Sequence, residues 1–189
     1  GFMKNKIILV CLLSFSCMYY SFKGSIPSHI KNIYLMPIMN QSSEFIISEI
    51  LDEQLGQLII EGNLLDIARP ESADSQLEIL ITSVVDKPYS IGLSDASGME
   101  EVEQWKLTIS SQVVWYDVKL DETLLKKNMT SWSVYAPGLD ISADLLDNDS
   151  DGFIDGEDSD EVGSARESAL NISIKRLALD IVNEINNTW

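Results

Sequence analysis

The sequence has few of the residues that catalytic, metal and nucleic-acid-binding sites require. Its 189 residues include one histidine and two cysteines, and 13 lysines and arginines stand against 30 acidic residues, for a formal charge of −17. So acidic a chain repels nucleic acid phosphates, which argues against a DNA- or RNA-binding role. The motifs G-x-S-x-G and H-E-x-x-H and the phosphate-binding P-loop are absent as well. We therefore expect no enzymatic activity.

Both cysteines lie in an N-terminal segment that has the pattern of a bacterial lipoprotein signal. Two lysines precede the apolar run 7–15 (IILVCLLSF) of about nine residues, whereas a membrane span takes about 20. The run ends at Ser-Phe-Ser followed by Cys17, a loose lipobox in which serine stands where leucine is usual. We predict a signal peptide over 1–16, a covalent lipid on Cys17 and a lipidated tether over 17–30. A plain secretory signal is the alternative.

Hydrophobic spacing in residues 31–189 predicts a single α+β domain. Apolar residues recur at spacings of three and four in two segments, and alternate with polar residues in the segments between them. Helices are expected at 44–61 and 165–185 and strands at 33–38, 77–85, 105–116 and 130–135, with a loop over 86–101 and a turn over 121–128. Near Val114 the alternation changes parity, which predicts either a bulge or burial on both faces of the strand. The expected architecture is two helices packed on one face of a mostly antiparallel or mixed sheet of about four strands.

Single residues with distinctive side chains are expected to be structural. His29 has no second histidine or cysteine with which to complete a metal site, so a surface or capping position is expected. Trp105, Trp115 and Trp132 lie on predicted strands and are expected in the core or in an interface. Trp189 is expected to dock the last helix, with contact to a partner as the alternative.

An acidic loop over 147–160 (DNDSDGFIDGEDSD) has the spacing of a calcium site. Calcium takes roughly six to eight oxygen ligands, which carboxylates at alternate positions around a central glycine can supply. The predicted ligands are the carboxylates of Asp147, Asp149, Asp151, Asp155 and Asp158 and the carbonyl oxygen of Phe153. The twelfth position is aspartate rather than the glutamate of an EF-hand, so the loop is closer to free-standing calcium loops. A structural Ca²⁺ is expected, and a solvated acidic insertion without metal is the alternative.

Three stretches of the mature chain share a pattern with one group of bacterial lipoproteins. They are CMYYSFKGSIPSHIKNIYLMPIMNQSSEF, which begins at Cys17, then ARPESADSQLEILI, and the strand 105–116, and the likeness ends at Trp189. The matching features of the first two stretches are Tyr20-Ser21-Phe22, Gly24, Pro27, the Ile30 to Ile33 lead into a strand, Asn40 before the first helix, and Ala73-Asp74. In these features the chain resembles the LptE family of outer-membrane lipopolysaccharide-assembly lipoproteins, in the form found outside the proteobacteria.

The resemblance implies a lipoprotein anchored through Cys17 in the inner leaflet of the outer membrane, on its periplasmic side. Its domain would plug and scaffold an LptD-type β-barrel during lipopolysaccharide transport and assembly. The family also implies contact with lipopolysaccharide, but no lysine or arginine here aligns with the basic residues implicated in that contact.

The acidic loop supports a competing interpretation from another class of protein, a calcium-dependent surface or adhesion lipoprotein.

Overall fold

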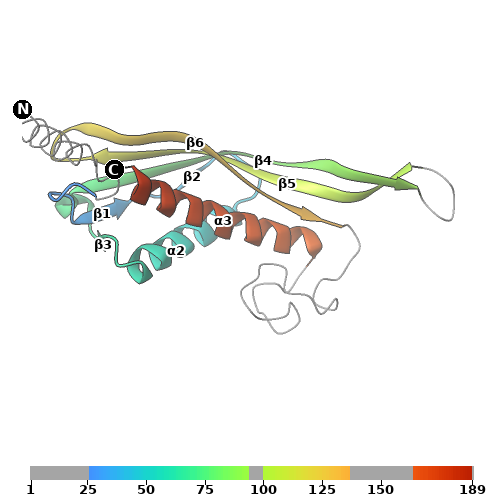
Figure 1. The fold of residues 1–189 in the computed structure, drawn as a ribbon, viewed down its shortest axis with the longest axis horizontal. Helices are drawn as coiled ribbons and strands as arrows, with labels where there is room; N and C mark the ends of the chain where they lie inside the picture. The colour runs from blue at the N-terminus through green and yellow to red at the C-terminus, as the bar shows by residue number, and fades with distance from the viewer. Residues whose placement is uncertain (1–25, 94–99, 137–163, 189) are drawn as a thin grey trace, which may run out of the picture.

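The computed structural model describes residues 26–93, 100–136 and 164–188 (Figure 1). Within these ranges the chain forms one six-stranded sheet and two α-helices. The elements are β1 (Asn32–Leu35), β2 (Met39–Asn40), α2 (Ile46–Glu61), β3 (Asp66–Ile67), the 3₁₀ turn η2 (Pro70–Ser72), β4 (Ser75–Leu93), β5 (Glu100–Asp117), β6 (Glu122–Tyr135) and α3 (Ala165–Asn187). Neither helix of this part of the chain has the length and hydrophobicity to cross a membrane.

The sheet is mixed, with strand order β3-β1-β4-β5-β6 and β2 paired to β4 beside β1. β1 pairs in parallel with β3 and with β4, and β2 pairs in parallel with β4. β4, β5 and β6 form an antiparallel meander. Both helices lie on the same side of the sheet (Figure 1). The predicted α+β class and two-helix layer are therefore confirmed. The sheet has more strands than the four expected. The two additional strands, β2 and β3, are only two residues each, too short to show alternation in the sequence.

The first helix is fixed at its start by a turn that Asn40 organises. The Asn40 side chain donates to the carbonyl oxygen of Glu44 at 2.8 Å and accepts from the N–H of Ser42 at 2.8 Å. This brings the chain round from β2 into α2, which buries one stripe of side chains against the sheet and α3. The stripe consists of Ile47, Leu51, Leu55 and Ile59. The spacing of three and four that predicted this helix therefore also identified its buried face.

A capping box starts the second helix. The Ser164 hydroxyl accepts from the N–H of Glu167 at 3.3 Å, and the Glu167 carboxylate accepts from the N–H of Ser164 at 3.0 Å. The Glu167 N–H also donates to the Ser164 carbonyl oxygen at 2.8 Å, whereas the Glu167 carboxylate gives the Ser164 N–H its partner, so the first turn is fixed by both residues. From there α3 runs across β5 and β6 and closes the core over Trp115, whose side chain is fully buried.

Two of the predicted irregular segments are wrong. The predicted turn 121–128 belongs to β6, because Glu122 to Asn128 pair with β5 and the hairpin needs only a short turn, in which Asp121 has a positive φ of 57°. The predicted loop 86–101 is largely strand, since β4 continues to Leu93 and β5 begins at Glu100. The bulge predicted near Val114 is not in β5, which keeps its alternation as far as Asp117; the register shift between Trp115 and Tyr116 comes from an extra residue, Leu124, in the partner strand β6.

Candidate functional site

The site residues predicted from the sequence lie outside the described ranges. These are Cys17, the six calcium ligands Asp147, Asp149, Asp151, Phe153, Asp155 and Asp158, and Trp189. The lipid on Cys17 and the calcium in the acidic loop therefore stay predictions. Within the residues that the structure does describe, no group of three or more histidine, cysteine or acidic side chains could hold a metal ion.

The side of the sheet opposite the helices is bare over β4, β5 and β6, since no described element packs on it (Figure 1). Alternation decides what lies there: Leu107 and Ile109 of β5 point into the core, so Thr108 and Ser110 point outward. The residues that share this outward parity are Gln76, Glu78, Leu80, Ser83, Val85 and Lys87 on β4, with Thr82 as the extra residue of the bulge beside Ser83, then Lys106, Thr108, Ser110, Gln112, Val114 and Tyr116 on β5, and Lys126, Asn128, Thr130, Trp132 and Val134 on β6. We call this set the open face. It is lined mostly by hydroxyl, amide and ammonium groups.

Its side chains interact with each other and with the strands. The Thr82 hydroxyl donates to the carbonyl oxygen of Ser110 at 3.0 Å, and the Gln112 amide contacts Asn128 at 3.4 Å. The Lys106 ammonium lies 4.0 Å from the centroid of the Trp132 ring. Such a cation–π contact restrains the half-exposed indole.

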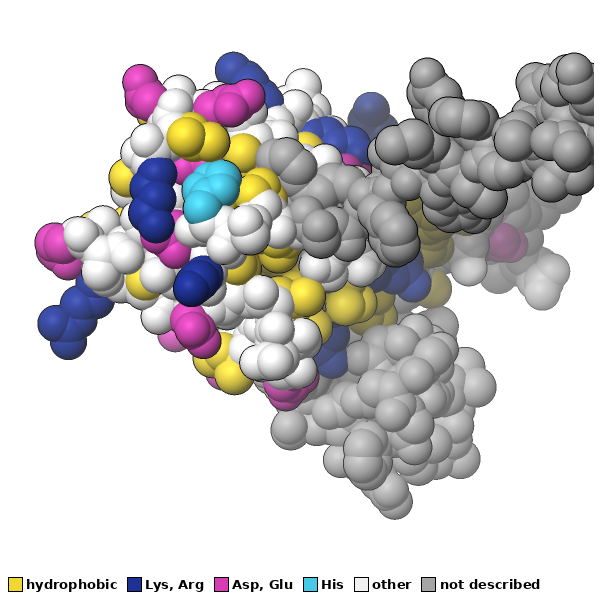
Figure 2. Space-filling model, turned by 60° about the vertical axis from the view of Figure 1, so that its left-hand side comes forward, with side chains coloured by type: hydrophobic (Ala, Val, Ile, Leu, Met, Phe, Trp, Pro, Cys, Tyr) yellow, Lys and Arg dark blue, Asp and Glu magenta, His cyan; other side chains and the backbone are white. Residues whose placement is uncertain are grey.

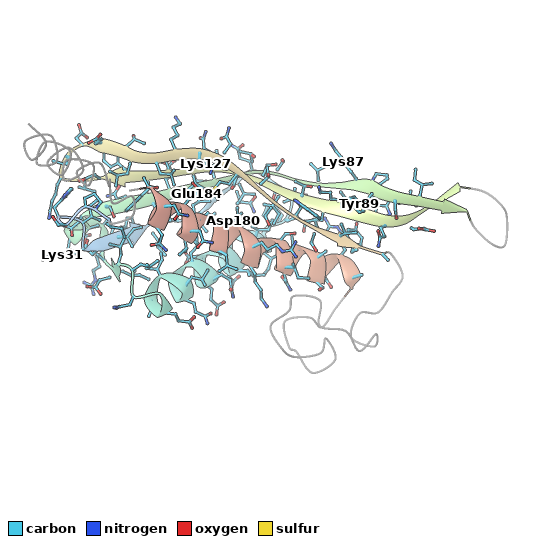
Figure 3. All side chains as sticks on the ribbon, in the orientation of Figure 1. Lys31, Lys87, Tyr89, Lys127, Asp180 and Glu184 are labelled. Carbon is cyan, nitrogen blue, oxygen red and sulfur yellow. The ribbon has the colours of Figure 1, made fainter. Side chains whose placement is uncertain are left out.

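The open face carries positive charge although the chain is strongly acidic. Lys87 and Lys106 are directly opposite one another in the β4–β5 register, and Figure 3 shows Lys87 on this side of the sheet. Like charges placed opposite each other destabilise a sheet slightly. The pair therefore favours surroundings that supply acceptors or negative charge.

A polar cluster at the end of the sheet where β4 begins holds the N-terminal segment (Figure 2). Asp117 is fully buried, and its carboxylate accepts from His29 Nε2 and from the N–H groups of Lys119 at 2.8 Å and Leu120 at 3.0 Å. Burial opposes ionisation of this carboxyl, but the hydrogen bonds from His29 and from the two amides outweigh it, so the pKa of Asp117 lies below its ordinary value.

A second buried carboxylate continues this cluster. Asp74 accepts from Lys119 Nζ at 2.6 Å and from the N–H of Lys31 at 2.9 Å, and its own N–H donates to Asn32 at 2.6 Å. The Lys119 ammonium, followed by the Lys31 amide, lowers the pKa of Asp74. Asp74 and Asp117 thus bind the segment from His29 to Asn32 to the sheet. We call these six residues, His29, Lys31, Asn32, Asp74, Asp117 and Lys119, the N-terminal latch.

A third network ties the helical layer to the strands. The Arg166 guanidinium contacts Glu44 at 2.7 Å and Asp86 at 2.9 Å, and the Tyr135 hydroxyl donates to Asp86 at 3.0 Å. Burial of the guanidinium works against its charge, but the bonds to Glu44 and Asp86 raise the pKa of Arg166. Tyr135 ends β6 and Arg166 starts α3, so this network joins the two flanks of the acidic segment to β4.

Sequence reasoning missed all three networks. His29 was expected at the surface or as a cap; its side chain is partly exposed, but it also binds an aspartate 88 positions away, which was not foreseen. Trp115 is in the core as predicted, Trp105 is half-buried, and Trp132 is 43% exposed on the open face. The only signal for the open face was the run of polar residues Lys106, Thr108, Ser110 and Gln112 at alternate positions.

The fold is similar to solved bacterial proteins at very low sequence identity. The hypothetical protein CT253 from Chlamydia trachomatis has a TM-score of 0.54 and 10% identity, over 84% of this chain and 98% of that chain. Protein XCC0632 from Xanthomonas campestris, of family DUF330, has a TM-score of 0.50 and 9% identity, over 87% of this chain and 90% of its own. Uncharacterized lipoprotein B from Nitrosomonas europaea has a TM-score of 0.45 and 12% identity, over 89% and 91%.

Identities this low establish similarity of fold alone. No family model matches the sequence, and no curated protein matches it either.

Proposed function

We propose that this chain is a non-enzymatic outer-membrane lipoprotein that plugs and scaffolds an LptD-type β-barrel during lipopolysaccharide transport and assembly. The observation that carries the proposal is the open face, which leaves one side of a long three-stranded meander without any covering element in the described part of the chain. A soluble domain that worked alone would expose this face only to water.

The chemistry of the open face suits the inside of a barrel. The lumen of an outer-membrane barrel is polar, whereas its outer wall is apolar. Hydroxyl and amide side chains such as Thr108, Ser110 and Gln112 can exchange hydrogen bonds with such a lumen without aggregating in its absence. The lysine pair Lys87 and Lys106 would find acceptors there.

The N-terminal latch supports the same arrangement. It fixes the chain from His29 onward to one end of the sheet. A lipid on Cys17 would then be separated from the folded domain by only the residues between Cys17 and His29. The domain would therefore stay close to the inner leaflet, where a barrel opens to the periplasm.

Co-purification tests the proposal directly. A C-terminally tagged full chain, extracted in mild detergent, should bring down a large outer-membrane β-barrel, and depletion of the chain should reduce lipopolysaccharide at the cell surface. Cys17→Ser should release the protein from the membrane fraction. Recovery of the tagged chain without a barrel, together with unchanged surface lipopolysaccharide after depletion, would refute the proposal.

Variants of the open face provide the structural test. Ser110→Trp places a bulky ring in the middle of the face and should reduce barrel recovery, because a lumen wall must approach the sheet closely. The matched control is Asp52→Trp on the exposed side of α2, which should leave recovery unchanged. The pair Asp149→Ala with Asp151→Ala should also leave it unchanged. Loss of cell or ligand binding in that pair, with barrel recovery intact, would favour the calcium-dependent adhesion interpretation.

A further inference from the structure

The long edge of β6 is open in the described structure. β6 is last in the strand order, so only one of its two sides pairs, and that side pairs with β5. An open edge this long is unusual, because exposed N–H and C=O groups recruit further strands. We therefore expect this edge either to pair with another strand or to be protected against such pairing.

The direction of the exposed backbone groups follows from one contact. Arg176 Nη1 donates to the carbonyl oxygen of Trp132 at 3.0 Å, so this carbonyl points away from β5. In an antiparallel pair the backbone groups of alternate residues point to the same side. Asn128, Thr130 and Val134 have the same parity as Trp132 with no register shift between them. The N–H and C=O groups of these four residues thus face the open edge.

A groove lies beside this edge, between β6 and α3. It has a volume of about 350 Å³ and is lined by Thr130, Ser131, Trp132, Arg176, Leu179, Asp180 and Asn183. Ser131 is 4% exposed, and its buried hydroxyl has no hydrogen-bond partner among the described residues. A buried hydroxyl without a partner is uncommon in native proteins. Leu179 is 47% exposed at the same place.

The charge along the edge favours one class of occupant. Over 126–134 the nearby basic groups are Lys106, Lys126, Lys127 and Arg176, and the nearby acidic groups are Asp180 and Glu184. Figure 3 shows Lys127, Glu184 and Asp180 along this side of the molecule, where Lys127 and Glu184 are paired at 2.7 Å. The edge is thus net positive in a chain of formal charge −17. A second copy of so acidic a chain is disfavoured by overall repulsion.

We propose that the β6 edge and its groove bind an extended acidic segment of another protein by strand addition. The segment would pair with the outward groups of Thr130 and Trp132 and displace the Arg176 guanidinium from the Trp132 carbonyl. An acidic side chain of that segment, pointing into the groove, would bind Arg176 and accept from the Ser131 hydroxyl. Main-chain bonds supply the affinity in such complexes and the side-chain pocket supplies the specificity. The inference goes beyond barrel plugging, since it requires no barrel.

Substitution of Thr130 by proline tests the edge of β6 without removing hydrogen bonds of the fold. The Thr130 N–H points outward, so Thr130→Pro removes an edge donor and leaves the hydrogen bonds to β5 in place. The matched control Thr130→Val retains the N–H. The probe is a fluorescent peptide of about nine residues that alternates glutamate and valine, long enough to span an average strand. A second probe has lysine in place of glutamate.

The purified full chain should bind the glutamate peptide at least about tenfold more tightly than the lysine peptide. Thr130→Pro should weaken binding of the glutamate peptide by about tenfold, because it removes the Thr130 N–H and places the proline ring at the edge. Thr130→Val should bind the peptide as the wild type does. Amide exchange at Thr130 and Trp132 should slow when the glutamate peptide is bound. Arg176→Glu should reverse the preference between the two peptides, which provides a test even if the proline variant folds poorly.

Three results would overturn the proposal. They are equal binding of both peptides, binding of the glutamate peptide by Thr130→Pro as tightly as by Thr130→Val, and no change in exchange at Trp132. Sedimentation of the full chain tests the other possible occupant of the edge, a second copy of the chain. A dimer that forms without peptide and is lost in Thr130→Pro would assign the edge to a second copy instead.

Discussion

Removal of the Asp117 carboxylate should destabilise the domain by about 3 kcal/mol, because three donors converge on this one buried group. Its oxygens accept from His29 Nε2 and from the N–H groups of Lys119 and Leu120. The turn that carries the two amides is exposed, so water can reach them after Asp117→Ala, and each lost bond counts about 1 kcal/mol. The interaction with His29, whose side chain is 36% exposed, adds about 1 kcal/mol more.

The asparagine variant isolates the charge from the geometry. In Asp117→Asn the amide oxygen can still accept from Lys119 and Leu120, and the NH₂ group can donate to His29. The expected loss is therefore about 1 kcal/mol, from the charge-assisted part of the His29 contact. Urea denaturation of both variants and the wild type, at pH 7 and equal protein concentration, measures the two losses.

The same residue predicts a direction of pH dependence. The pKa of Asp117 is below its ordinary value of 3.8 in the folded protein, since its hydrogen bonds outweigh the effect of burial. A carboxyl whose pKa is lower in the folded than in the unfolded state stabilises the protein at pH values above its unfolded-state pKa. This contribution is lost as the pH falls through its folded-state pKa. The difference in unfolding free energy between wild type and Asp117→Asn should thus be constant at neutral pH and shrink below pH 3.8.

The reasoning is refuted if Asp117→Ala costs less than about 1 kcal/mol, or if Asp117→Asn is as destabilised as Asp117→Ala. The first result would mean that water replaces the carboxylate as acceptor for all three donors without loss. The second would mean that the negative charge, and not the hydrogen-bond geometry, holds the N-terminal latch together.

Three further substitutions test other parts of the fold, each by urea or thermal denaturation. Trp115→Ala should cost about 4 kcal/mol through a core cavity, whereas Trp115→Phe should cost only about 1 kcal/mol, since the indole N–H has no partner among the described residues. Ser164→Ala should cost about 1 kcal/mol by removing the hydroxyl that accepts from the Glu167 N–H and donates to the Glu167 carboxylate at the start of α3. Arg166→Met should cost about 1 to 2 kcal/mol, because it leaves half-exposed carboxylates facing each other, and adding Asp86→Asn should restore part of the loss.

Local sequence pattern was enough to predict the elements that bury a continuous stripe or alternate cleanly. Both helices and the Leu107-to-Trp115 part of β5 belong to this group, because their apolar residues recur with the period of the element. The change of parity near Val114 was misleading, because β5 alternates regularly as far as Asp117 and the extra residue at this level is Leu124 of β6. The capping box of Ser164 and Glu167 was also present in the sequence and was missed.

Pairing across the sheet determined the parts that the sequence did not predict. Residues 122–128 are polar apart from the adjacent pair Leu124 and Leu125, which gives no alternation, yet they form a strand because β5 offers a ladder beside them. Lys87 to Leu93 contains proline and glycine, which indicate a loop in isolation, but the partner strand holds it extended through two register shifts. Likewise, nothing near His29 in the sequence points to Asp117, since only the fold brings them together.

The length of β4 sets a distance between the two ends of the molecule. The strand has 19 residues, which at about 3.3 Å each gives a span of about 60 Å. The N-terminal latch lies where β4 starts, and the end of β4 at Leu93 lies at the opposite end of the sheet (Figure 1). A bilayer with its headgroups is about 40 to 45 Å thick. A chain tethered by lipid at the latch end, with the sheet aligned along the membrane normal, would therefore carry the Leu93 end of β4 past the opposite surface of the membrane.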